Sequence, residues 1–219
     1  MQNRSAFTRY VGCALLVLMG CASPAVALNP ANDDLDDCGD PFQNAYGPFD
    51  YRTATPFQKQ LVEGTHFPRK VETLQEGNTS TLGGDIGYTL RAFPNDPRAL
   101  LAMVRLGQRD KTNKPQGSIF SVACFLERAV AFRPDDVNVW IVRGVYFTMQ
   151  RRYDAAIQDF NTALKLDPQS GNAHYDLGLA YFETKQFGKA LEEAKLAKSF
   201  GFPLDGLKHK LTAVGQWHE

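Results

Sequence analysis

The sequence predicts an all-α fold, a solenoid of stacked helix hairpins with an extended N-terminal leader and a C-terminal capping helix. Small and aromatic residues recur at helical intervals in residues 137–170, where Trp140, Gly144 and Phe147 share one face. A shift of 34 residues superposes this stretch on the next one. Prolines punctuate the chain at comparable distances, at Pro94, Pro134, Pro168 and Pro203. Since one helix pair cannot bury its own apolar face, we expect neighbouring pairs to stack.

The first element is a predicted export signal, residues 1–27. Two arginines precede the apolar run 11–19, which is too short to span a bilayer, and a small-residue cleavage site follows at 25–27. A second possibility lies in the same stretch, because residues 18–21 resemble a bacterial lipobox in which Cys21 would be lipidated. The first alternative predicts a periplasmic protein. The second predicts a lipoprotein anchored to the membrane and facing the periplasm.

Charge argues against one class of partner. The whole chain carries 24 basic and 24 acidic residues, and residues 1–27 hold two of the arginines and no acid. Removal of that segment leaves 22 basic against 24 acidic residues, a net charge of minus two. This balance gives no basis for nucleic-acid binding, which needs a basic face.

Two cysteines remain after cleavage at residue 27, Cys38 and Cys124. In an oxidising compartment such a pair usually forms a disulfide. The alternative is a buried free Cys124 on its helix and a solvent-exposed Cys38. A bridge would fix the leader to the body of the protein.

The leader comprises residues 28–54 and has an acidic start followed by an aromatic stretch. Its aromatic residues, Phe42, Tyr46, Phe49 and Tyr51, are too many for a disordered linker, so we expect it to lie extended against the folded body. One hypothesis places it along the groove of the repeats. The other holds that a Cys38–Cys124 bridge keeps it away from that groove.

Residues 55–96 form a predicted helical region with a degenerate repeat. Thr55 and Pro56 are typical of a helix start, and that helix is expected to run to about residue 63. A second helix is predicted from residue 68 to about residue 75, and residues 82–94 repeat the spacing of a hairpin's second helix. Residues 97–136 predict a further degenerate repeat, whose helices are separated by a loop insertion across residues 108–118.

Residues 137–170 carry a specific signature, with Trp140, Gly144, Phe147, Tyr153, Ala156, Phe160, Ala163 and Pro168. This resembles the tetratricopeptide (TPR) repeat, W-x2-L-G-x2-Y followed by A-x3-F and proline, although Arg143 stands where the pattern has leucine. Residues 171–203 are a second such unit, with Gly178, Phe187 and Ala190 in register and with His174 in place of the tryptophan. Residues 204–219 predict the capping helix.

The TPR resemblance implies a binding surface, because the first helix of each unit lines a concave groove in that family. The corresponding positions are Asn138, Ile141, Val145, Thr148, Met149, Asn172, Tyr175, Leu179, Phe182 and Glu183. The lysines and arginines with which some family members clamp a peptide carboxylate are missing here, so that activity is not expected. The alternative is that these residues pack against segments of the same chain.

The sequence contains no catalytic constellation and no motif for a metal or a cofactor. The resulting prediction is a non-enzymatic exported TPR scaffold or adaptor that binds a protein partner in a cell-envelope assembly. The alternative is a cell-envelope enzyme, for example one acting on the cell wall, with a site in residues 38–95.

Overall fold

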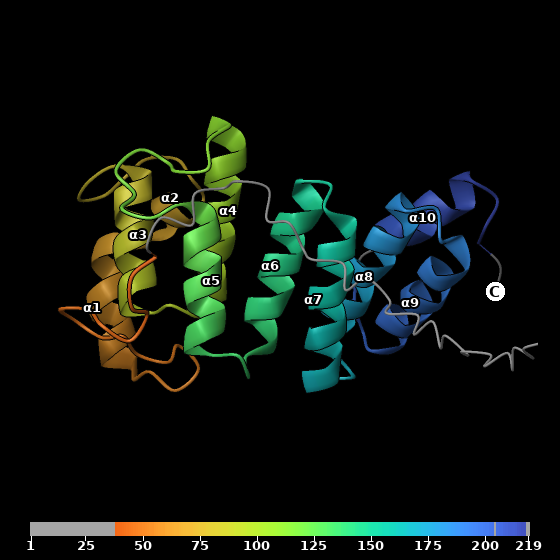
Figure 1. Cartoon of the computed structure of the whole chain (residues 1–219), viewed down its shortest axis with the longest axis horizontal. Helices are drawn as coiled ribbons and strands as arrows, with labels where there is room; N and C mark the ends of the chain where they lie inside the picture. Colours follow the sequence, from red (N-terminus) through yellow and green to blue (C-terminus); the bar gives the residue numbers. More distant parts are fainter. Residues whose placement is uncertain (1–37, 204, 218–219) are drawn as a thin grey trace, which may run out of the picture. The chain divides into compact units, whose positions relative to one another are not determined.

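The computed structural model describes residues 38–203 and 205–217, which lie in one compact unit, Leu35–Glu219. The described residues form ten helices and no strand (Figure 1). The helices are α1 (Pro56–His66), α2 (Arg69–Glu72), α3 (Leu82–Ala92), α4 (Pro97–Asp110), α5 (Val122–Phe132), α6 (Val137–Met149), α7 (Tyr153–Leu166), α8 (Gly171–Glu183), α9 (Phe187–Ser199) and α10 (Gly206–Ala213). The predicted all-α class is confirmed. The predicted export signal, Cys21 included, lies outside the described residues.

The helices of the two signature units pack as hairpins, α6 with α7 and α8 with α9, and α7 packs on α8 (Figure 1). The α6–α7 crossing is close because Gly144 has no side chain. A Cβ atom at Gly144 would come within 2.5 Å of the Phe160 ring, which is itself fully buried. The short turns before α7 and α9 place Arg151 and Lys185 at positive φ, 59° and 61°.

Polar side chains fix where six of the helices begin, by accepting hydrogen bonds from backbone N–H groups of the first turn. These residues are Thr55, Thr81, Asp96, Ser121, Asp136 and Ser170. The helix predicted at 68–75 is shorter than expected, because the chain leaves α2 at Thr73 and Leu74 adopts a positive φ of 59°.

The described part of the leader, which starts at Cys38, is attached to α5. Cys38 and Cys124 form the predicted disulfide, and Arg128 Nη1 donates a hydrogen bond of 2.7 Å to the Cys38 carbonyl oxygen. The Phe42 ring then lies 5.5 Å from that of Phe132, at the other end of α5. Residues 38–42 of the leader therefore follow α5, a second helix of a hairpin.

The rest of the leader packs where α3 ends. The rings of Phe49 and Tyr51 lie 6.0 Å and 5.7 Å from that of Phe93, and the Phe49 N–H donates to the Ala92 carbonyl oxygen at 2.8 Å. Tyr46 joins the same cluster. The hypothesis that these aromatic rings cover the predicted groove is wrong, and the described leader follows the alternative course.

A buried polar network holds this course. The Asp50 carboxylate pairs with Arg52 and Arg133, each at 2.8 Å, and Asn95 Nδ2 donates to Asp50 and to Asp136, again at 2.8 Å each. The hydrogen bond from Arg52 holds the pKa of Asp50 well below its usual range, an effect that burial opposes only in part. The leader is thus joined to the connections that follow α3 and α5.

Helix α10 caps the repeats. Leu207 and Leu211 are buried against α8 and α9, and Trp217 packs onto the same cluster. Gly178 allows this contact, since a Cβ atom there would lie 2.5 Å from Leu207 Cδ2. No helix of the described residues has both the length and the apolar character needed to cross a bilayer.

Candidate binding site on the repeat surface

The predicted groove residues of α6 are in different environments. Ile141 is buried against Ala163 and Ala173, and Val145 is half-buried. Thr148 donates a hydrogen bond to the Gly144 carbonyl oxygen at 2.9 Å, whereas Met149 is 38% exposed. Asn138 is also exposed, so the two ends of this row are open and its middle takes part in packing between the repeats.

The predicted groove residues of α8 contact the C-terminal segment of the same chain. The Tyr175 ring lies 4.4 Å from that of Phe202, and Leu179 and Phe182 pack on the cluster that contains Leu207 and Leu211. Lys210 pairs with Glu183 at 3.0 Å. Only Asn172, near the start of the helix, has no such contact and is exposed. In the α8 half of the groove, the apolar side chains thus pack against residues of the same chain, and no partner is needed to cover them.

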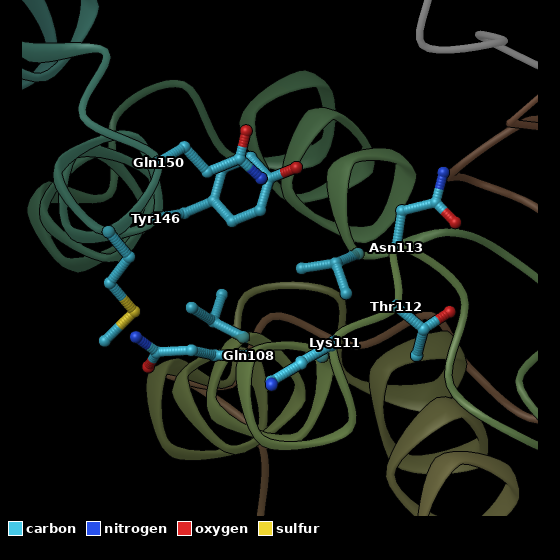
Figure 2. A pocket seen from close by; sticks show the side chains of 10 residues that line it. Gln108, Lys111, Thr112, Asn113, Tyr146 and Gln150 are labelled. Atoms are coloured by element: carbon cyan, nitrogen blue, oxygen red, sulfur yellow. The ribbon is translucent and has the colours of Figure 1, made fainter.

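A pocket of about 280 Å³ opens between the C-terminal ends of α4 and α6 (Figure 2). Its apolar wall consists of Val104, Gly107, Val122, Tyr146 and Met149. Its polar rim consists of Gln108, Lys111, Thr112, Asn113 and Gln150. Met149 is therefore a predicted groove residue that lines this pocket.

The long α4–α5 connection builds one side of this pocket. Helix α4 ends at Asp110, and its C-cap Lys111 adopts the left-handed conformation with φ 52°. The Val122 N–H donates to the Asn113 carbonyl oxygen at 2.7 Å. Gly107 permits the close approach of this loop, because a Cβ atom there would lie 2.8 Å from Val122 Cγ2 and 3.0 Å from the Thr112 carbonyl oxygen. The chain thus turns back across the end of α4 and leaves a walled cavity beside α6.

The pocket combines groove positions from two helices. Gln108 follows the N-cap Asp96 of α4 at the same distance as Thr148 follows the N-cap Asp136 of α6. Gln108 is therefore the α4 equivalent of the predicted groove residue Thr148. The 34-residue register does not extend to Gln108, because the insertion after α4 breaks it. Aligning the N-cap residues Asp96 and Asp136 in the sequence would have identified Gln108 as a groove position. Figure 2 shows Gln108 and Lys111 on one side of the cavity and Tyr146 and Gln150 on the other.

A polar cluster in the region proposed for an enzyme site has a structural role. His66 Nδ1 lies 3.2 Å from Asp85 Oδ1 and 3.0 Å from Thr79 Oγ1, and the Thr79 hydroxyl also donates to the Asp85 carboxylate. Burial raises the pKa of Asp85, but hydrogen bonds from Thr79 and from the Asn78 backbone outweigh it and hold that pKa well below its usual range.

The Thr79 hydroxyl oxygen and the Asp85 carboxylate oxygen both lie beside the same nitrogen of His66, Nδ1. The imidazole ring therefore does not bridge the hydroxyl to the carboxylate through its two nitrogens, as a proton relay requires. The cluster fixes the loop before α3. His174 is likewise structural, since its two ring nitrogens lie 2.6 Å from Glu193 and 3.0 Å from the Pro168 carbonyl oxygen. Among the described residues, no group of histidine, cysteine and carboxylate side chains has the arrangement of a metal site.

Comparison with known proteins identifies the repeat. Residues 147–185, from the end of α6 to just beyond α8, match the family model described as the TPR repeat. Among solved structures, MamA AMB-1 superposes with a TM-score of 0.45 at 17% identity, over 73% of this chain and 82% of that chain. A MamA point mutant gives 0.42 at 20% identity, over 60% and 77%. Because both TM-scores are below 0.5, the repeat assignment rests on the family match and on the helix pattern.

Proposed function

Because the chain carries TPR repeats, we propose that it is a non-enzymatic scaffold that binds a protein partner at the pocket between α4 and α6. TPR repeats present extended surfaces for protein–protein interaction. The observation that carries the proposal is the uneven use of the predicted groove. Its α8 half is packed against the C-terminal segment, whereas Met149 and Gln108 border an open pocket of about 280 Å³.

The partner is proposed to belong to a cell-envelope assembly. Residues 1–27 have the composition of an export signal, and the Cys38–Cys124 disulfide is typical of an oxidising compartment. Two versions of this proposal differ in the mature N-terminus, which is residue 28 after simple cleavage and lipidated Cys21 in the lipoprotein alternative. Intact mass measurement of the protein purified from envelope fractions distinguishes them.

Site-specific photo-crosslinking tests the scaffold. We would place p-benzoylphenylalanine at Met149, beside the pocket, or at Leu196 on α9. These positions are matched, with exposures of 38% and 39%. Irradiation of cells is expected to give a discrete adduct with a partner protein from Met149 and none from Leu196. Equal labelling from both positions, or no adduct from Met149, would contradict the proposed site.

A further inference from the structure

The pocket between α4 and α6 is bordered by an excess of positive charge on a chain that is formally neutral. Residues 105–114 hold four basic side chains against the single carboxylate of Asp110. Arg109 engages that carboxylate at 2.8 Å. The remaining basic residues of this segment, Arg105, Lys111 and Lys114, form no ion pair with any described residue. On the other side of the pocket, Arg151 and Arg152 follow Gln150, and Asp154 is the next acidic residue along the chain. Neither arginine forms an ion pair with a described residue.

Lys111 is the basic residue that lines the pocket itself. Its backbone is the left-handed cap of α4, which sets the direction of its Cα–Cβ bond. In Figure 2 this side chain runs along the α4 side of the cavity, near Gln108. An unpaired ammonium group beside a wall of Val104, Val122 and Met149 is suited to a ligand that carries an apolar group and a carboxylate close together.

Size narrows the class of ligand. Small-molecule and cofactor sites usually enclose roughly 300–1,000 Å³, and this pocket of about 280 Å³ lies at the lower end. It has room for one large apolar side chain rather than for an extended cofactor. Apart from Lys111, the basic residues of segments 105–114 and 151–152 do not line that volume, and flanking residues of a bound segment would run beside them.

We propose that the partner segment is acidic, with one leucine or phenylalanine side chain in the pocket and neighbouring carboxylates facing Lys111 and Arg105. This inference rests on the proposed scaffold function and specifies the chemistry of the partner. The apolar anchor supplies affinity through burial, while the carboxylates supply orientation and a faster association rate. Lysine-rich segments would be repelled by the same border.

Fluorescence anisotropy with defined peptides tests this proposal on the whole mature protein. The probe is a labelled glutamate-rich peptide with one central leucine. One matched peptide has alanine in place of the leucine, and another has lysines in place of the glutamates. We expect the glutamate–leucine peptide to bind at least tenfold more tightly than either, and its affinity to fall as salt is added. Equal binding of the lysine peptide, or no binding of the glutamate–leucine peptide, would overturn the proposal.

Variants assign the effect to the pocket. Lys111→Glu is expected to raise Kd for the glutamate–leucine peptide about tenfold. Lys111→Asn, which suits the left-handed backbone, should raise it about threefold. Lys195→Glu on α9 makes the same charge change at an exposed residue and is expected to leave Kd unchanged. An unaltered Kd in both Lys111 variants, with helical content retained, would refute the inference. The Met149 crosslink reports independently on the scaffold, so a crosslink without charge preference leaves the scaffold standing and removes only the acidic partner.

Discussion

At Gly144 the α6–α7 crossing leaves no space for a side chain. The added methyl of Gly144→Ala would meet the fully buried Phe160 ring at 2.5 Å, and that ring has little room to move. We expect a loss of about 2 kcal/mol in the free energy of unfolding, since overpacking a core costs roughly 1–3 kcal/mol. Gly188→Ala is the control, because a Cβ atom there meets nothing within 4 Å, and it should stabilise α9 by up to about 1 kcal/mol. Urea denaturation measures both, and equal effects would contradict the close crossing.

Asp96 is a fully buried cap whose stability contribution depends on pH. Burial raises the pKa of Asp96 to about 6, above the roughly 3.9 of an unfolded aspartate, and its Oδ2 atom has no hydrogen-bond partner among the described residues. The folded state therefore holds this proton more tightly, and stability is lost as pH rises from about 4 to above 6.

Asp96→Asn keeps a capping side chain and removes this titration. The stability of the wild-type protein relative to this variant is expected to fall by roughly 2 kcal/mol between pH 4 and pH 7.5. Other titrating groups cancel in the difference, so thermal or urea unfolding of both proteins across this pH range isolates Asp96. A difference that does not change with pH would show that Asp96 is charged throughout.

At the scale of the element, the leader is held by one covalent bond and by the Asp50 network. The disulfide joins residues 86 apart, so it restricts a long loop of the unfolded chain. The double variant Cys38→Ala with Cys124→Ala is expected to lose about 2–4 kcal/mol of stability. Adding reductant should destabilise the wild-type protein by a similar amount and leave the double variant unchanged. A wild-type protein insensitive to reductant under unfolding conditions would mean that the bridge is not formed.

Elements with local signals could be predicted from the sequence, and elements fixed by distant contacts could not. Gly144 on α6 and Ala156 and Phe160 on α7 stand at the spacings of the repeat signature, and the structure places Gly144 against Phe160 at the crossing of the two helices. The leader has no such periodicity. Its course depends on contacts such as that between Phe49 and Phe93, whose partners are far apart in the sequence. A composition rich in aromatic rings shows that the leader must pack, but not where.

The binding surface was predictable only in part for the same reason. The repeat register predicts both Met149 and Tyr175 as groove residues. Met149 borders the pocket, whereas Tyr175 packs on Phe202. The insertion after α4 shapes the cavity, and insertions follow no repeat pattern. Lys111 could have been noticed as part of a basic cluster, but the sequence did not reveal that the loop would turn back beside α6.

For the molecule as a whole, the apolar core is divided along the chain. One cluster spans α2 to α6 and includes Ile86, whereas Leu207 and Leu211 belong to a separate cluster formed by α8, α9 and α10. In a solenoid each repeat contacts chiefly its neighbours, so damage at one end should spread only weakly to the other. This arrangement predicts that the two ends open with different free energies.

Hydrogen exchange measured by mass spectrometry tests this division with two matched truncations. Leu207 is 1% exposed and Ile86 is fully buried, so each change to alanine is expected to cost about 2–5 kcal/mol locally. Leu207→Ala should speed exchange in α8 and α9 while α3 to α5 keep their protection, because α10 then no longer covers the last repeat. Ile86→Ala should do the reverse. If both variants accelerated exchange uniformly along the chain, the described residues would unfold as one cooperative unit, and the cap would stabilise the pocket between α4 and α6 as strongly as it stabilises α8.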